Sequence, residues 1–182
     1  MLFRSKPDTS SSRYETLDAA GVRRMTAPNR QVKTGLDVWE EEKFRAVQGK
    51  RIGLITNHTG LDRNGKRNID AMREAGVQLT ALFSPEHGIS GKEDRPDIAD
   101  AKDAASGLPV WSLYANSKYR ASPAKFSTVD ALVFDMQDVG ARFYTYSCTL
   151  LNSMEDAAKA KVPFYVLDRP NPITGAHIEG PV

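Results

Sequence analysis

The chain has 182 residues, of which 40% are hydrophobic and 26% are charged. This is the ordinary balance of a single globular domain that can build a hydrophobic core. No apolar run approaches the ~20 residues that a membrane-spanning helix needs, so we predict no membrane span.

Charge separates the first 34 residues from the rest of the chain. Residues 1–34 contain seven Lys/Arg and three Asp/Glu, which leaves the remainder with a net charge of −2. A slightly acidic domain lacks the basic surface that binds nucleic-acid phosphates, so we predict no nucleic-acid partner. Residues 1–34 also show no sustained period of 2 or 3.6, which predicts a disordered basic tail. They contain no apolar stretch of roughly 7–15 residues, so no secretory signal is visible.

Regular structure is predicted from Gly35 onward. Residues 40–47 have the pattern of a short helix, which Gly49 would end. Short apolar segments then alternate with helical patterns. The predicted strands are 51–56, 77–83, 109–114, 130–136 and 163–167, and the predicted helices are 68–75 and 146–161.

The order of these elements indicates the fold class. Helix 146–161 has the strongest pattern, with an apolar stripe of Leu150, Leu151, Met154, Ala157 and Ala158. Strands that are apolar throughout and alternate with helices favour a parallel sheet covered on both faces. We therefore predict an α/β domain over residues 35–182, with a doubly wound, mostly parallel sheet of about five strands.

Polar residues follow four of the predicted strands. They lie in the segments 56–60 (Thr-Asn-His-Thr-Gly), 84–88 (Ser-Pro-Glu-His-Gly), 135–144 and 168–172 (Asp-Arg-Pro-Asn-Pro). The carboxyl ends of parallel strands meet at one edge of the sheet, where open α/β folds bind ligands. Loops are polar in general, but four successive edges with ionisable groups favour a binding or catalytic site.

Missing motifs narrow the chemistry of this site. The sequence has no G-x-G-x-x-G after the first strand, no Walker A motif and no G-x-S-x-G motif. Dinucleotide binding, nucleoside triphosphate binding and the usual serine hydrolase mechanism therefore lack support. His58 and His87 do not have H-E-x-x-H spacing, and we predict neither a metal nor another cofactor, although separate loops could still assemble metal ligands.

The remaining candidates are carboxylates, which suit glycoside hydrolysis because one of them must protonate the leaving oxygen. Glu86 is the strongest candidate acid, since Pro85 and Gly88 constrain its loop and His87 is placed to hold it. Asp138 is a further candidate. Asp135 and Asp168 end strands and are equally well explained as structural residues that bind loop amides.

Four segments in order resemble one known family. Residues 53–60, 82–89, 133–146 and 167–173 resemble the NamZ-type exo-β-N-acetylmuramidases, a family long catalogued as a domain of unknown function. The resemblance implies a Rossmann-like catalytic domain followed by a smaller second domain, before which this chain ends. It also implies removal of terminal N-acetylmuramic acid from the non-reducing end of peptidoglycan fragments, and a periplasmic or secreted location.

The resemblance also suggests roles for single residues. Glu86 matches the family's proposed catalytic residue, and we group His87 with it. The lactyl carboxylate of the sugar calls for a cation, for which Arg142 and Arg169 are candidates, although each is equally well explained by pairing with Asp138 or Asp168. Tyr144 and Tyr146 would stack on a sugar or pack in the core. The predicted substrate-binding residues are Asn57, His58, Asp135, Gln137, Asp138, Arg142, Tyr144, Arg169 and Asn171.

Two other functions compete with hydrolysis. A non-catalytic module would hold a muropeptide or sugar in the same cleft, and it would not need Glu86 as a proton donor. An interaction or nucleotide-binding domain would instead use the basic tail. The 2-acetamido group of the sugar can act as an internal nucleophile, so hydrolysis does not require an obvious second carboxylate.

Overall fold

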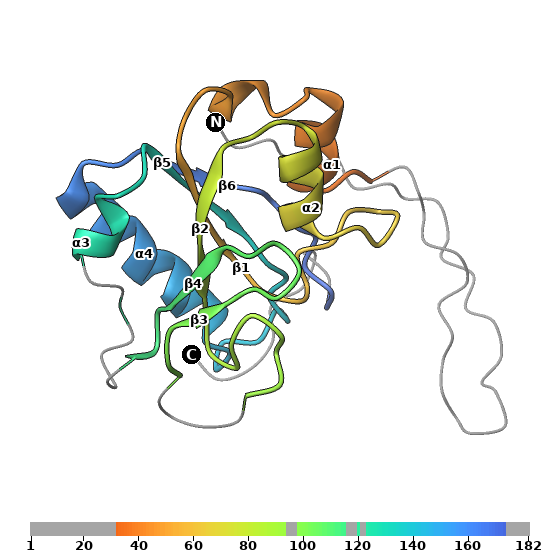
Figure 1. The fold of residues 1–182 in the computed structure, drawn as a ribbon. Helices are drawn as coiled ribbons and strands as arrows, with labels where there is room; N and C mark the ends of the chain where they lie inside the picture. Colours follow the sequence, from red (N-terminus) through yellow and green to blue (C-terminus); the bar gives the residue numbers. More distant parts are fainter. Residues whose placement is uncertain (1–31, 94–97, 116–119, 121–122, 174–182) are drawn as a thin grey trace, which may run out of the picture. The chain divides into compact units, whose positions relative to one another are not determined.

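The structure is a computed structural model that describes residues 32–93, 98–115, 120 and 123–173. Its centre is a six-stranded sheet in the order β3-β4-β2-β1-β5-β6 (Figure 1). The strands are β1 (Ile52–Thr56), β2 (Leu79–Ser84), β3 (Ala101–Lys102), β4 (Pro109–Ser112), β5 (Ala131–Asp135) and β6 (Phe164–Val166). All pairings are parallel except that of β3 with β4. The predicted α/β fold with a mostly parallel sheet is confirmed, and β3 is the strand that the sequence pattern missed.

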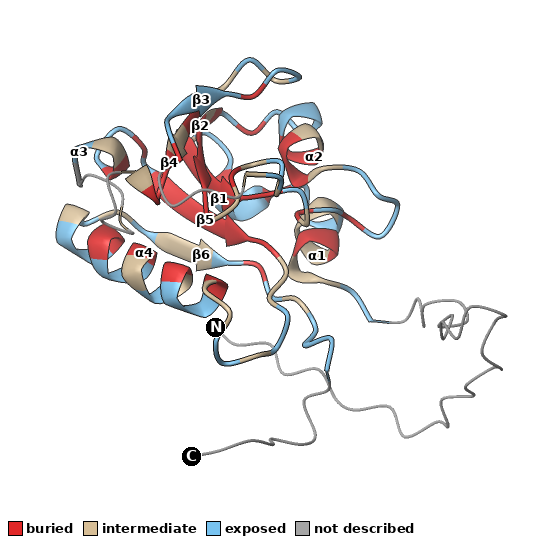
Figure 2. Cartoon of the chain, turned by 90° about the horizontal axis from the view of Figure 1, so that it is seen from below, coloured by how far each residue is buried: buried red, intermediate tan, exposed pale blue. Residues whose placement is uncertain are grey.

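Helices cover both faces of this sheet (Figure 2). One face carries α1 (Gly35–Glu41), a short 3-10 helix η1 (Arg45–Val47) and α2 (Asn68–Glu74), and the other carries α3 (Pro123–Phe126) and α4 (Tyr146–Ala160). None of the described helices is both long and apolar enough to cross a bilayer. The predicted disordered tail lies outside the described residues except for residues 32–34.

The core is divided by the sheet into two hydrophobic clusters. Along β5, Ala131 and Val133 belong to the cluster under α1 and α2, whereas Leu132 and Phe134 belong to the cluster under α3 and α4. Side chains alternate between the two faces of a strand, so a strand buried on both faces must be apolar at every position. This explains the continuous apolar runs in the sequence.

The first helix begins earlier than predicted. Thr34 Oγ1 accepts a hydrogen bond from the Asp37 amide at 3.2 Å, and Asp37 Oδ2 accepts one from the Thr34 amide at 2.8 Å. This capping box starts α1 at Gly35. Lys43 and Phe44 then adopt φ values of 53° and 51°, which interrupt the helix, so the predicted helix over 40–47 is wrong.

The predicted apolar stripe of α4 is correct for Leu150 and Ala157, which pack in the core, and wrong for its other three members. Leu151 and Met154 are 58% and 46% exposed, whereas the buried residues of the helix are Tyr146, Thr149, Ser153, Asp156 and Ala157. The polar members of this face find partners outside the helix. Asp156, for example, accepts a hydrogen bond from Arg120 at 2.7 Å.

Strand order fixes where a ligand site can form. β1 lies between β2 and β5, so the chain leaves β1 toward one side of the sheet and later returns to its other side. Open α/β sheets bind ligands in the crevice that such a reversal leaves at the carboxyl ends of the strands. The loops that follow β1, β2 and β5 all start at this edge.

Candidate active site

Glu86 lies in the loop that follows β2, and its side chain is half-buried. Its Oε2 accepts a hydrogen bond of 2.6 Å from Thr145 Oγ1, at the start of α4. Tyr114 and Tyr146 are close enough to interact electrostatically with its carboxylate. Burial is the main cause that raises the pKa of both tyrosines, and the negative charge of Glu86 adds to both shifts. The predicted acid thus lies between the end of β4 and the first turn of α4.

The loop around Glu86 has an unusual backbone. His87, Gly88 and Gly91 have φ values of 68°, 72° and 70°, in the left-handed region. His87 Nδ1 lies 2.9 Å from the backbone oxygen of Glu93. A carbonyl oxygen only accepts, so Nδ1 carries the proton and, in the neutral ring, Nε2 keeps its lone pair. His87 therefore anchors its own loop. It does not hold the Glu86 carboxyl, which corrects the prediction from the sequence.

His58, from the loop after β1, packs against the Glu86 loop. A Cβ added to Gly91 would lie 2.1 Å from the His58 ring, so the imidazole rests directly on this glycine. The side chain of His58 is exposed. The loops after β1 and β2 are thus in contact at one end of the sheet, as the sequence predicted.

Asn57 is buried and belongs to the framework of the site. Its Nδ2 donates to the Tyr146 hydroxyl at 2.6 Å, and its Oδ1 accepts from the amide and hydroxyl of Thr59 at 2.9 and 2.6 Å. Thr59 Oγ1 in turn accepts from the Gln137 amide at 2.9 Å. Gln137 Nε2 spans to the backbone oxygens of Asp138 and Pro170. These bonds join the loops after β1, β5 and β6.

Asp135 and Arg169 form a buried ion pair. Arg169 Nε and Nη2 donate to the two carboxylate oxygens at 2.7 and 3.0 Å, and the side chains of Arg169 and Asp135 are 8% and 0% exposed. Asn68 Nδ2 donates to the same carboxylate at 2.8 Å. The predicted ligand contacts of these two residues are therefore corrected. Asp135 has no exposed surface, and Arg169 uses both Nε and Nη2 to bind the Asp135 carboxylate.

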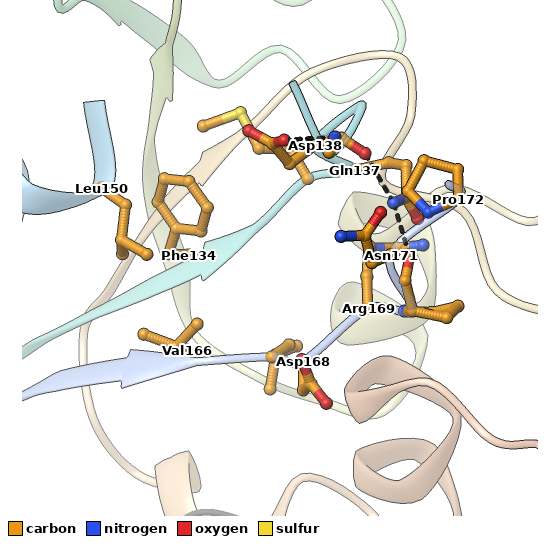
Figure 3. A pocket seen from close by; sticks show the side chains of 13 residues that line it. Phe134, Gln137, Asp138, Leu150, Val166, Asp168, Arg169, Asn171 and Pro172 are labelled. Carbon is orange, nitrogen blue, oxygen red and sulfur yellow. Dashed lines mark hydrogen bonds between the residues drawn. The ribbon is translucent and has the colours of Figure 1, made fainter. Parts of the chain in front are cut away.

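A cavity of about 200 Å³ lies over β5 and β6, next to the loops that follow them (Figure 3). Phe134, Leu150 and Val166 lie at one end of it, and polar side chains including Gln137 and Asn171 lie at the other. Asp138 Oδ1 accepts from the Gly140 amide at 2.7 Å, whereas its buried Oδ2 has no hydrogen-bond partner in the described structure. Glu86 does not line this cavity, so this cavity is not a cleft shared by Glu86 and Asp138.

The remaining predicted residues are accessible. Arg142 is exposed, and Tyr144 is half-buried with its ring 4.6 Å from that of Tyr146 in an edge-to-face contact. Asn171 is exposed and caps its own loop through the Ile173 amide. Tyr146 is only 3% exposed and packs in the core. Thr145 is the residue that sequence reasoning missed, although it directly follows Tyr144 in a segment rich in polar residues.

Metal ligands do not gather around these loops. Across the part of the chain that the structure describes, no three His, Cys, Asp or Glu side chains are placed to hold a metal ion. The donors at the sheet edge are instead engaged in the bonds described above or belong to separate loops.

Comparison with known proteins identifies relatives of this chain. A family model described as "Exo-beta-N-acetylmuramidase NamZ, N-terminal" matches residues 52–182. The chain is 43% identical to the peptidoglycan beta-N-acetylmuramidase NamZ of Bacillus subtilis over 93% of its own length and 42% of that protein. The chain thus spans less than half of this relative.

Two solved structures share its fold. Both are DUF1343 family proteins of Bacteroides fragilis, with TM-scores of 0.76 and 0.64 and sequence identities of 45% and 34%. They cover 84% and 77% of this chain, which matches 38% and 35% of their lengths. Both the matched family model and the arrangement of the sheet-edge loops agree with the sequence resemblance. The chain therefore belongs to the NamZ exo-β-N-acetylmuramidase family, of which it represents the N-terminal domain.

Proposed function

We propose that the protein is a glycosidase that releases terminal N-acetylmuramic acid from the non-reducing end of peptidoglycan fragments. The observation that carries this proposal is the setting of Glu86. One carboxylate oxygen is held by Thr145, and in the described structure the other makes no hydrogen bond to the protein. A half-buried carboxyl group with one uncommitted oxygen at the ligand edge of an α/β sheet suits a general acid.

In the proposed reaction Glu86 acts in its protonated form. It donates its proton to the glycosidic oxygen, so the bond between that oxygen and the anomeric carbon breaks without releasing an alkoxide. The anomeric carbon is left electron-deficient, and a nucleophile bonds to it. The 2-acetamido oxygen of the sugar is the candidate nucleophile. Water then adds at the same carbon, the bond from the acetamido oxygen to that carbon breaks, and the proton that water loses returns to the Glu86 carboxylate. Glu86 thus lowers the activation barrier by preventing negative charge from building up on the leaving oxygen.

Substrate recognition is assigned to the exposed residues of the same edge. Arg142 is the proposed partner of the lactyl carboxylate, because Arg169 is committed to Asp135. Tyr144 offers a half-buried ring to a sugar face, and His58, His87, Asp138 and Asn171 offer polar groups. Saccharides containing N-acetylmuramic acid and N-acetylglucosamine are thus the proposed partners. Since peptidoglycan lies outside the cytoplasmic membrane, the proposed location is the periplasm or the cell exterior.

The proposal is tested with Glu86→Gln in the full-length protein. Gln keeps the size of the side chain and can still accept from Thr145, but it cannot deliver a proton. We expect kcat on a chromogenic N-acetylmuramide to fall by ~10²–10⁴-fold, with saccharide binding and the unfolding midpoint unchanged. A substrate with a better leaving group should lose less. Glu74→Gln is the matched control, because it removes an exposed carboxylate that pairs with Lys66 on the surface.

Two results would contradict the proposal. Unchanged turnover per folded molecule in Glu86→Gln would show that the carboxyl group is not the acid. Saccharide binding by the wild-type protein without any turnover would identify a binding module instead.

A further inference from the structure

Two threonines precede helices in this structure, and they use their hydroxyl groups differently. Thr34 caps α1 in the usual way, with its Oγ1 bound to the Asp37 amide. Thr145 occupies the same position before α4, but its side chain makes no capping hydrogen bond. Its hydroxyl donates to Glu86 Oε2 at 2.6 Å instead. The backbone of Thr145 is helical, with φ −80° and ψ −11°, whereas that of Thr34 is extended, so the Thr145 side chain is not placed to cap α4.

We propose that Thr145 is a positioning residue for Glu86, which determines the carboxylate oxygen that reacts. This inference rests on the proposed role of Glu86 as the general acid. With Oε2 occupied by the Thr145 hydroxyl, the acid proton resides on Oε1. The Thr145 hydroxyl can donate to Oε2 in both the ionised and the neutral acid, so proton transfer needs no rearrangement of this contact.

The backbone of Thr145 is bound within the first turn of α4. Its carbonyl oxygen accepts from the amide and from the hydroxyl of Thr149, at 2.9 and 3.0 Å. Thr149 Oγ1 also lies 2.9 Å from the Tyr114 hydroxyl, and Tyr114 is hydrogen-bonded to the Thr145 side chain as well. Thr149 and Tyr114 are both buried. The first turn of α4 is therefore joined to the end of β4, and the Thr149 amide keeps the Thr145 backbone in place without the Thr149 hydroxyl.

The decisive variants are Thr145→Val, which removes the hydroxyl at constant shape, and Thr145→Ser, which retains it. The Glu86 carboxyl is followed by ¹³C NMR in protein with labelled glutamate, with Glu86→Gln used to assign the signal. We expect this signal to shift in Thr145→Val, because the carboxylate oxygen loses its hydrogen-bond donor, and to stay in place in Thr145→Ser. Thr149→Val is the control, since it removes a buried hydroxyl one turn further along α4 that does not touch Glu86.

Kinetics provide the second readout. In Thr145→Val the kcat on a chromogenic N-acetylmuramide should fall about 10-fold with little change in KM. Thr145→Ser should restore kcat. Thr149→Val should lower the unfolding midpoint without shifting the Glu86 carboxyl signal.

Two outcomes would overturn the inference. One is a Glu86 carboxyl signal in folded Thr145→Val at the wild-type position. The other is an equal shift of that signal in Thr149→Val, which would indicate a general effect of α4. The NMR measurement requires no turnover, so it decides the role of Thr145 even if the proposed hydrolase activity fails.

Discussion

Arg169 and Asp135 join the ends of β6 and β5 through two hydrogen bonds, of 2.7 and 3.0 Å, inside the protein. Arg169 Nη2 also donates to the Leu61 backbone oxygen at 3.1 Å, in the loop region after β1. One guanidinium group thus holds three segments that come together at the ligand edge of the sheet. It thereby fixes the relative positions of the loops at this edge.

We expect Arg169→Met to lower the free energy of unfolding by about 3–5 kcal/mol, because it leaves the Asp135 carboxylate buried without its partner. Urea unfolding followed by circular dichroism measures this loss. Arg51→Met is the control, since the pair of Arg51 with Asp130 is exposed and its removal should have little effect. Equal losses in the two variants would show that burial does not govern the Arg169 pair.

Gly91 supports the His58 ring, so Gly91→Ala should disturb both loops of the proposed site. The added methyl group would lie 2.1 Å from the imidazole, at a φ of 70° that already disfavours alanine. We expect shifted His58 NMR signals and at least a tenfold loss of turnover. Gly49→Ala isolates the backbone term, because Gly49 has a φ of 73° and no atom near the added methyl group. Turnover equal to wild type in Gly91→Ala would refute this role of the glycine.

Asp103 should contribute to the loss of stability in acid. Burial alone would raise the pKa of Asp103, but hydrogen bonds from Ser106 and Arg67 outweigh it, and its pKa lies below the usual value. A carboxyl group with a depressed pKa in the folded state stabilises the protein above its unfolded pKa of ~3.9. That contribution is lost as the pH falls through the lower folded pKa.

Asp103→Asn should therefore lower the free energy of unfolding by about 1–3 kcal/mol at pH 7. Below pH 4 the stability of this variant should fall less steeply than that of the wild-type protein. Urea unfolding at a series of pH values measures both effects. An acid limb as steep as that of the wild-type protein would show that Asp103 does not contribute.

The buried face of α4 can be tested with two substitutions. Leu151 is 58% exposed, so Leu151→Gln should change the free energy of unfolding by no more than about 0.5 kcal/mol. Ala157 is 1% exposed, so Ala157→Leu should cost about 1–3 kcal/mol through overpacking. Thermal unfolding compares the two variants. A loss of stability in Leu151→Gln as large as that in Ala157→Leu would place Leu151 back on the buried face.

The sequence predicted the sheet well, because strands buried on both faces leave an unambiguous apolar record. It predicted the α4 stripe poorly, since its buried face includes Thr149 and Asp156, whose partners come from distant segments. The same limit applies to Arg169. Its neighbours in sequence suggested Asp168, whereas the parallel pairing of β5 with β6 returns it to Asp135.

The sequence predicted which loops form the site, but not which of their residues are buried in its framework and which are accessible. Polar residue types at strand ends located Glu86 and His58 at the same edge. They could not distinguish Asn57, which is buried and fully engaged, from Arg142, which is exposed. That difference depends on which side chains fold inward, and a single sequence carries no direct signal of it.

The two outermost strands of the sheet are also its shortest, with two residues in β3 and three in β6. An outer strand offers unpaired amide and carbonyl groups to which a foreign strand can add, and this is a common start of aggregation. Brief outer strands limit such templates to very few groups, while the long strands β1, β2 and β5 are enclosed between neighbours. The sheet therefore keeps its longest and most apolar strands away from other chains.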